Sequence, residues 1–105
     1  MGDALQSLVA AAFAVKVNQL QASTRGEARA AFARQAGIYL ARTRLGLEYA
    51  AAGQMFGRDR TTAAYACRRI EERREDPAID GLIECLEQAI DVHPAFHLGE
   101  VQKCR

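Results

Sequence analysis

The spacing of apolar residues near the N-terminus predicts an amphipathic helix. Five of them recur at intervals of three and four residues and therefore share one helical face: Leu5, Leu8, Val9, Ala12 and Phe13. We expect this helix to run from Asp3 to about Ala14, with Asp3 as its N-cap. One more short helical turn is expected from Val17 to Gln21.

A longer helix is expected in the middle of the chain. The segment Ser23 to Gly26 carries capping and helix-breaking residues, and the following range, Glu27 to Arg44, has no breaker except Gly37. Its apolar residues again follow helical spacing: Ala28, Phe32, Ala36, Tyr39 and Leu40. We therefore predict a long central helix that is ended by Gly46.

Two helices separated by a glycine turn are expected next. The range Leu47 to Phe56 predicts a short helix with these periodic residues: Leu47, Ala50, Ala51, Gln54 and Met55. Gly57 tolerates the left-handed conformation that the following turn needs, and Asp59 can cap a helix from Arg60 to about Arg74. The inward stripe of that helix is expected to be Ala63, Ala66, Cys67 and Ile70.

A last amphipathic helix should follow the break at Asp76-Pro77 and stop before His93-Pro94. Its apolar stripe consists of Ile79, Leu82, Ile83, Leu86 and Ile90. The fold class is therefore predicted to be all-α, a small bundle of five to six helices. We expect residues 1–92 to form a single domain and residues 93–105 to form a flexible tail.

The composition agrees with one small domain. The chain has 105 residues, of which 50% are hydrophobic, enough for one modest core. The apolar stretch Leu8 to Val15 is far shorter than the roughly 20 residues of a membrane span, and no positive segment precedes it. Three cysteines without CxxC spacing favour a reducing compartment, so we expect a cytoplasmic protein.

The charged residues are distributed unevenly. From Arg25 to Arg74 there are eleven arginines and five acids, whereas from Glu75 to Glu100 there are seven acids and no lysine or arginine. A basic middle joined to an acidic end indicates a polyanionic partner for the middle, although charges scattered over an ordinary surface remain an alternative.

The two helices around Gly57 have the layout of a helix-turn-helix, in which the second helix enters the DNA major groove through its N-terminal residues. The face opposite the predicted inward stripe presents Thr61, Tyr65, Arg68 and Arg69, with Arg58, Asp59 and Arg60 at its start. Arginine can bind guanine with two hydrogen bonds, aspartate can accept from cytosine, and threonine can contact a thymine methyl group.

These residues also carry a family resemblance. The segment ARQAGIYLARTRLGLEYAAAGQMFGRDRTTAAYACRRIEE, residues 33–72, resembles the C-terminal DNA-binding domain of the bacterial replication initiator DnaA. The resemblance extends over about residues 8–90. It implies major-groove contacts for Asp59, Thr61 and Thr62. It further implies phosphate contacts for Gln35, Tyr65 and Arg69, and a minor-groove loop at 23–29 that retains Arg25 and Arg29.

The chain also departs from that family. Arg60 stands where the family signature has a histidine, which exchanges a small imidazole for a long guanine-seeking side chain and puts the initiator's own recognition sequence in doubt. Glu27 lies between the two arginines of the minor-groove loop and should weaken its contact. The chain has no P-loop pattern and no length for an ATPase domain, so it is not expected to be the initiator itself.

The complete predicted DNA-binding set is Arg25, Arg29, Arg34, Gln35, Arg58, Asp59, Arg60, Thr61, Thr62, Tyr65, Arg68 and Arg69. Three roles stay open. Asp59 is either a plain N-cap, a base contact or both, and Tyr65 either reaches a phosphate or lies at the edge of the core. Arg73 and Arg74 either contact DNA or are solvated or paired with Glu71 and Glu75, and we expect the latter.

The leading hypothesis is a sequence-specific double-stranded DNA-binding protein that regulates transcription. Short proteins of this type resemble regulators of alphaproteobacteria, including activators of prophage-like gene transfer agents, which implies a partner at RNA polymerase. The acidic last helix is the candidate surface for that partner. Two alternatives are a replication modulator that competes at initiator sites and a protein-interaction module that has lost DNA binding.

No cofactor, metal or enzymatic activity is expected. His93, His97 and Cys104 lie in a weakly patterned tail with no fourth ligand at a fixed spacing, which argues against a zinc site. Cys67 lies on an inward stripe and should be a buried thiol instead of a nucleophile. No Ser-His-Asp or paired-carboxylate arrangement has support in the sequence.

Overall fold

The computed structural model describes residues 2–21 and 28–96, and within them every regular element is helical. The elements are α1 (Gly2–Phe13), α2 (Val17–Leu20), α3 (Ala28–Thr43), α4 (Tyr49–Gln54), α5 (Arg60–Arg73), α6 (Pro77–Val92) and a 3-10 helix η1 (Pro94–Phe96). The predicted all-α class is confirmed.

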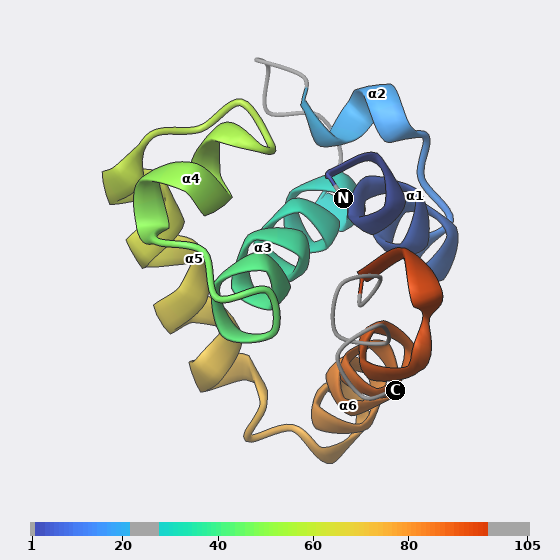
Figure 1. Ribbon diagram of the computed structural model, residues 1–105. Helices are drawn as coiled ribbons and strands as arrows, with labels where there is room; N and C mark the ends of the chain where they lie inside the picture. Colours follow the sequence, from blue (N-terminus) through green and yellow to red (C-terminus); the bar gives the residue numbers. More distant parts are fainter. Residues whose placement is uncertain (1, 22–27, 97–105) are drawn as a thin grey trace.

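Helix α3 runs through the middle of the molecule, as Figure 1 shows, with α4 and α5 on one side and α1 and α2 on the other. Six successive residues of α3, from Ala36 to Ala41, are buried, because helices surround it. This explains why its apolar residues extend beyond the single stripe that the sequence predicted. The central helix therefore organises the core.

Gly37 allows α3 to approach the chain just after α4. A Cβ atom at this position would lie 2.4 Å from the ring atom Cζ of Phe56, which is a steric overlap. Phe56 itself is fully buried and therefore anchors the segment between α4 and α5 on the central helix. The glycine that looked like a possible helix breaker is thus a packing position.

The inward residues of α5 and of α1 follow the predicted pattern. The stripe of α5 is buried as expected at Ala63, Ala66, Cys67 and Ile70. On α1, Leu5, Val9 and Phe13 are buried, whereas Leu8 is half-buried and Ala12 is exposed. Asp3 lies in the first turn of α1 and not before it, so its predicted role as N-cap is wrong.

The predicted periodic face of the short helix α4 is wrong. Ala50, Ala51 and Gln54 are exposed, and the buried residues of this element are Ala52 and Gly53. A run of alanines and a glycine gives no contrast between an apolar and a polar face, so the spacing alone could not orient this helix.

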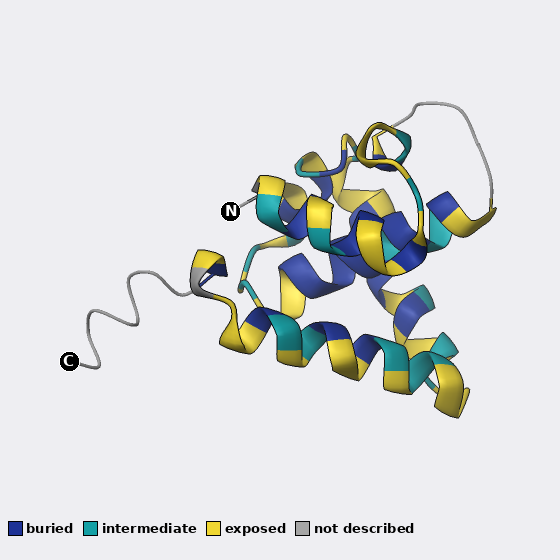
Figure 2. Cartoon of the chain, turned by 90° about the vertical axis from the view of Figure 1, so that its right-hand side faces the viewer, coloured by how far each residue is buried: buried dark blue, intermediate teal, exposed yellow. Residues whose placement is uncertain are grey.

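Helix α6 packs across the C-terminal ends of α3 and α5. Its buried residues Ile83, Leu86 and Ile90 recur along one face, and Figure 2 shows the resulting alternation of buried and exposed positions along the helix. The helix begins at Pro77, at the predicted break, and Asp76 is its N-cap, because its side chain accepts a hydrogen bond from the amide of Ala78 at 2.9 Å.

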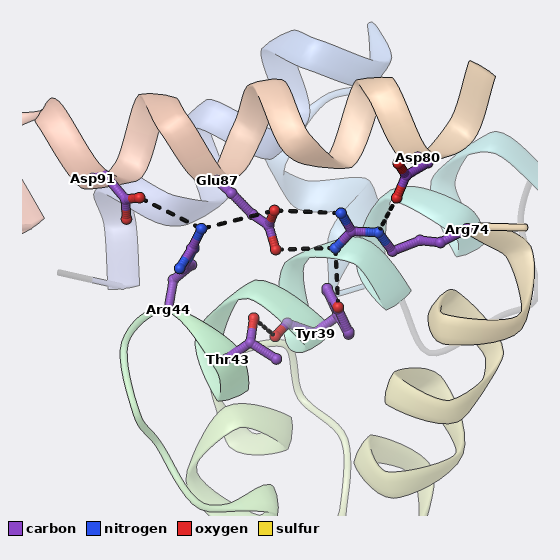
Figure 3. Close-up of polar contacts among 7 residues, drawn as sticks. All are labelled: Tyr39, Thr43, Arg44, Arg74, Asp80, Glu87 and Asp91. Atoms are coloured by element: carbon purple, nitrogen blue, oxygen red, sulfur yellow. Dashed lines mark hydrogen bonds and ion pairs between the residues drawn. The ribbon is translucent and has the colours of Figure 1, made fainter. Parts of the chain in front are cut away.

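A network of charged and polar side chains also holds α6 in place (Figure 3). Arg74 donates to Asp80 at 2.6 Å, to Glu87 at 3.0 Å and to the hydroxyl of Tyr39 at 3.1 Å. Arg44 forms ion pairs with Glu87 at 3.9 Å and Asp91 at 3.5 Å. We call these five charged residues and Tyr39 the α6 network.

The α6 network corrects two expectations. The partners of Arg74 are acids of α6 and not Glu71 or Glu75. Partial burial alone would lower the pKa of Arg74, but hydrogen bonds to Asp80, Glu87 and Tyr39 raise it above its usual value. The acidic last helix was expected to offer a surface to a partner, yet the side chain of Glu87 is only 12% exposed because it lies between the two arginines.

The described structure continues beyond residue 92, the predicted end of the domain. Helix η1 follows α6 directly, and Phe96 is buried against the core, with its ring 5.6 Å from that of His93. Phe96, near the start of the expected tail, therefore contacts the core, and the flexible tail itself stays a prediction. Residues 97–105 lie outside the described part of the chain.

Candidate nucleic-acid interface

The turn between α4 and α5 is held together by short backbone contacts. Gly57 has a φ of 71°, the left-handed conformation that the sequence predicted for it. The amides of Phe56 and Arg58 both donate to the carbonyl of Gly53, at 2.9 and 2.8 Å. The turn is thereby closed onto the last residues of α4.

Gly53 is required by the close approach of the two helices. A Cβ atom here would lie 2.8 Å from the carbonyl oxygens of both Arg58 and Asp59. Backbone atoms cannot move away as a flexible side chain can, so any larger residue would push the start of α5 outward. The position of α5 therefore depends on a residue without a side chain.

Asp59 is the N-cap of α5. Its Oδ1 atom accepts a hydrogen bond from the amide of Thr62 at 2.8 Å. This bond, together with one from the Thr62 side chain, lowers the pKa of the Asp59 carboxyl group. The N-cap role is confirmed, while a base contact by the same exposed carboxylate stays a prediction.

The outward face of α5 carries the residues predicted to contact DNA. Arg60, Thr61, Thr62, Tyr65 and Arg68 are all exposed. Tyr65 is 52% exposed, which contradicts the alternative that places it at the edge of the core. We call these five residues, together with Asp59 before them, the recognition face.

Two further predicted residues lie beside the recognition face and have contacts within the protein. Arg69 is half-exposed and pairs with Glu72 one turn further along α5, at 3.7 Å. Arg58 is half-buried, and its Nη1 atom donates to the carbonyls of Phe56 and Gly57 at 3.3 and 3.2 Å.

Arg34 is not placed as a surface contact. It is 8% exposed, and its guanidinium donates from Nε to the carbonyl of Leu20 at 2.6 Å and from Nη2 to that of Gln19 at 3.1 Å. These carbonyls belong to the last two residues of α2, where a helix leaves its carbonyls without regular helical partners, and that of Gln19 also accepts from the amide of Gln21. Burial, and then the nearby charge of Arg58, lower the pKa of Arg34. Its expected DNA contact is therefore replaced by a role inside the protein.

The remaining predicted residues lie on or before α3. Gln35 is half-buried, and Arg29 is exposed with a long hydrogen bond of 3.4 Å to the carbonyl of Ala14. Arg25 and the rest of 22–27 lie outside the described residues. The predicted minor-groove contact therefore stays a prediction.

Sequence reasoning missed two glutamines that contact the turn. The side-chain amides of Gln6 and Gln21 both donate to the carbonyl of Met55, at 2.6 and 3.4 Å. Gln6 is only 7% exposed although it is polar. Its position next to the apolar stripe of α1 was the only available signal, and a pattern search classifies such a residue as solvent-facing.

The described residues offer little for catalytic or metal chemistry. Cys67 is buried, and burial followed by the charge of Glu71 raises the pKa of its thiol to about 11. Across residues 2–21 and 28–96 no three His, Cys, Asp or Glu side chains gather as metal ligands would. The helices in these ranges are also too short or too polar to cross a membrane.

A short helix, a glycine turn and a capped second helix with an open basic face define a helix-turn-helix domain of the DNA-binding class, a fold without catalytic machinery. A family model described as the bacterial DnaA protein helix-turn-helix matches residues 3–70. The chain belongs to this family, as its resemblance in sequence predicted.

Curated relatives support the same assignment. The chain is 35% identical over 77 residues to the chromosomal replication initiator protein DnaA 2 of Chlamydia trachomatis, which covers 73% of this chain and 17% of that protein. Identity to the protein of the same name from Chlamydia pneumoniae is 37% over 68 residues, covering 65% of this chain and 15% of the relative. The chain thus spans less than a fifth of the length of these relatives.

Proposed function

We propose that this protein binds double-stranded DNA sequence-specifically through the recognition face and thereby regulates transcription. The observation that carries the proposal is the exposed N-terminal half of α5, in which Arg60, Thr61 and Tyr65 stand opposite a fully apolar buried stripe. A helix-turn-helix places this half of its second helix against base edges in the major groove.

The side chains of this face suit base recognition and phosphate binding together. Arg60 makes no ion pair with another described residue, and at the first position of α5 it is placed to donate two hydrogen bonds to a guanine. Thr61 and Thr62 offer methyl and hydroxyl groups beside it. Tyr65 and Arg69 lie one to two turns further along, where phosphate contacts are expected.

Selection from a random duplex library tests the proposal. We expect the protein to enrich one sequence motif and to bind it with an affinity that falls as salt rises. The double variant Arg60→Ala with Thr61→Ala should lose the motif. The matched control is Thr43→Ala with Arg44→Ala, which removes the same two residue types at the far end of α3 and should retain the motif. Enrichment of no motif by the parent protein would refute the proposal.

A second candidate is replication control at initiator sites, favoured by the identity to initiators of Chlamydia. It requires that this protein and an initiator select the same motif. Arg60 argues against a shared motif, because a long bidentate donor and a small imidazole prefer different bases. The motif obtained from the random library therefore separates the two functions.

A protein partner that links the bound DNA to RNA polymerase belongs to the same proposal. Because Asp80, Glu87 and Asp91 are engaged in the α6 network, the surface left for such a partner is the outer face of α6, where Gly81, Glu84 and Gln88 are exposed. Such a regulator would act in the cytoplasm, at the nucleoid.

A further inference from the structure

The carbonyl oxygen of Met55 accepts hydrogen bonds from two glutamine side chains outside α4. Met55 is the C-cap of α4, the point at which the chain leaves that helix for the turn. Gln6 of α1 donates to its oxygen at 2.6 Å, and Gln21, just after α2, donates at 3.4 Å. Two elements distant in sequence therefore meet at the first residue of the turn.

Gln21 is itself held in place by Arg34. The guanidinium of Arg34 binds the carbonyls of Gln19 and Leu20, the two residues before Gln21, from within the core. Position 34 lies on α3, the central helix, so these contacts form a chain from α3 through α2 to the turn. We call Gln6, Gln21 and Arg34 the polar brace.

The proposed DNA binding requires the turn between α4 and α5 to be held in a fixed position. It must deliver Arg58, Asp59 and Arg60 to the DNA at the start of α5, and functional groups have to be held within about 0.5 Å of their working positions. On the side of the core, Phe56 packs on Gly37. Gly53 lies close to the backbone at the start of α5. The polar brace adds contacts from α1 and α2 to the backbone bonds that tie the turn to α4 at Gly53 and Gln54.

We propose that Gln6, Gln21 and Arg34 are positioning residues that set the angle at which α5 meets DNA, and so determine sequence selectivity without contacting DNA. This inference rests on the proposed DNA binding. It assigns to Arg34 a role behind the interface, in place of the surface contact expected from the sequence. Hydrogen bonds of this kind are directional, which suits the fixing of an angle better than apolar packing does.

The first test uses the protein without DNA and follows amide hydrogen exchange at Gly57 and Arg58. Gln6→Met keeps the size of the side chain but removes the donor to Met55. We expect exchange at these two amides to accelerate about fivefold, the factor that corresponds to one hydrogen bond. The matched control Thr43→Val removes one side-chain bond to the backbone, that to Tyr39, at the far end of α3 and should leave both amides unchanged.

The second test compares two duplexes, the motif that the parent protein selects and a scrambled sequence of equal length. Gln6→Met should lower the ratio of the two affinities about fivefold while leaving the scrambled affinity and its salt dependence unchanged. Gln21→Ala, at an exposed position that does not endanger folding, should lower the ratio in the same direction. Arg34→Lys should retain more of the ratio than Arg34→Met, because lysine can still donate to the two carbonyls whereas methionine has no donor.

The outcomes separate the two proposals. Unchanged exchange at Gly57 and Arg58 in Gln6→Met and Gln21→Ala would refute the polar brace, whether or not the protein binds DNA. If exchange is faster but the affinities for the selected motif and for the scrambled sequence fall equally, these residues have only a general structural role. Their part in selectivity would then be refuted. If the parent protein selects no DNA motif, the DNA-binding proposal is wrong, and the proposed effect on selectivity is wrong with it. The exchange data would still show whether the polar brace stabilises the turn.

Discussion

The recognition face and the α6 network use arginine in opposite ways. Arg60 and Arg68 are exposed and make no ion pair with any described residue, whereas Arg44 and Arg74 are paired with acids of α6. The paired arginines stand just after the C-terminal ends of α3 and α5, where a positive charge is also favoured by the helix dipole. Exposed arginines without an ion pair are available to an external polyanion, and arginines paired with acids stabilise the packing of a helix.

The comparison also separates two parts of the chain. The recognition face lies within residues 3–70, which the family model matches, while α6 lies beyond that range. Three of the four acids of α6, Asp80, Glu87 and Asp91, are engaged by Arg44 and Arg74, whereas Glu84 lies exposed on the outer face of the helix. An acidic segment next to a basic one can therefore be part of the same folded unit.

The largest effect is expected from Glu87→Lys, which places a third positive charge between Arg44 and Arg74. Breaking a largely buried ion pair costs about 3–5 kcal/mol of the free energy of unfolding. Chemical denaturation measures the loss, and Glu84→Lys, at an exposed position, should change stability by less than about 0.5 kcal/mol. Equal losses in both variants would show that the α6 network is not needed for packing.

Gly53→Ala should disturb the other region. The added methyl group meets two backbone carbonyls, and overpacking of this kind costs about 1–3 kcal/mol. We expect a loss of about 2 kcal/mol in denaturation and a weaker selection of DNA sequence, because the start of α5 has to move. Gly81→Ala is the control, since a Cβ atom there meets nothing within 4 Å and alanine favours the helix. A fully stable Gly53→Ala variant would contradict the packing described for the turn.

Arg60→His should alter sequence preference with little effect on the fold. A bidentate contact from arginine to guanine discriminates between bases by about 1–3 kcal/mol. We expect the variant to lose the preference for one guanine and to shift towards the motif of an initiator, measured by competition between duplexes. If parent and variant select the same motif, Arg60 makes no base contact.

The smallest effect is expected at the cap of α5. The hydrogen bonds from Thr62 lower the pKa of Asp59 below its usual 3.8, so they stabilise the folded state most when the carboxyl group is ionised. This contribution is present above pH 3.8 and is lost as the pH falls through the lower pKa of the folded state. Asp59→Asn also caps a helix but does not titrate. Denaturation curves recorded from about pH 2 to pH 7 measure the free energy of unfolding of parent and variant. We expect the two proteins to differ in how this free energy changes with pH only below about pH 4. If it changes with pH in the same way in both proteins over the whole range, the ionisation of Asp59 is not linked to folding.

Sequence patterns predicted which residues of α5 are buried and which are exposed, for a physical reason. Helix α5 has a polar face and an apolar stripe, so the burial of Ala63, Ala66, Cys67 and Ile70 and the exposure of the opposite side follow from the helical period alone. The turn before it needed a left-handed residue and a cap, and Gly57 and Asp59 are the residue types that supply them.

Sequence patterns could not predict the features of the structure that depend on contacts between residues distant in sequence. The charge of Arg34 suggested exposure, yet its partners are carbonyls 14 and 15 residues away. Gln6 and Met55 are separated by 49 residues, and the pairing of Arg74 with Glu87 depends on how α6 folds back. In α4 the run of small residues left its orientation undetermined. Such contacts follow from tertiary packing and have no periodic signature.

The salt dependence of DNA binding tests most directly whether an arginine of α5 contacts DNA while the arginines of the α6 network do not. Arg69→Gln and Arg44→Gln remove the same charge from α5 and from the α6 network. If Arg69 contacts a phosphate, the slope of log K against log salt should fall in magnitude by about 0.9 in Arg69→Gln and stay unchanged in Arg44→Gln. Equal slopes in both variants and the parent protein would contradict the account.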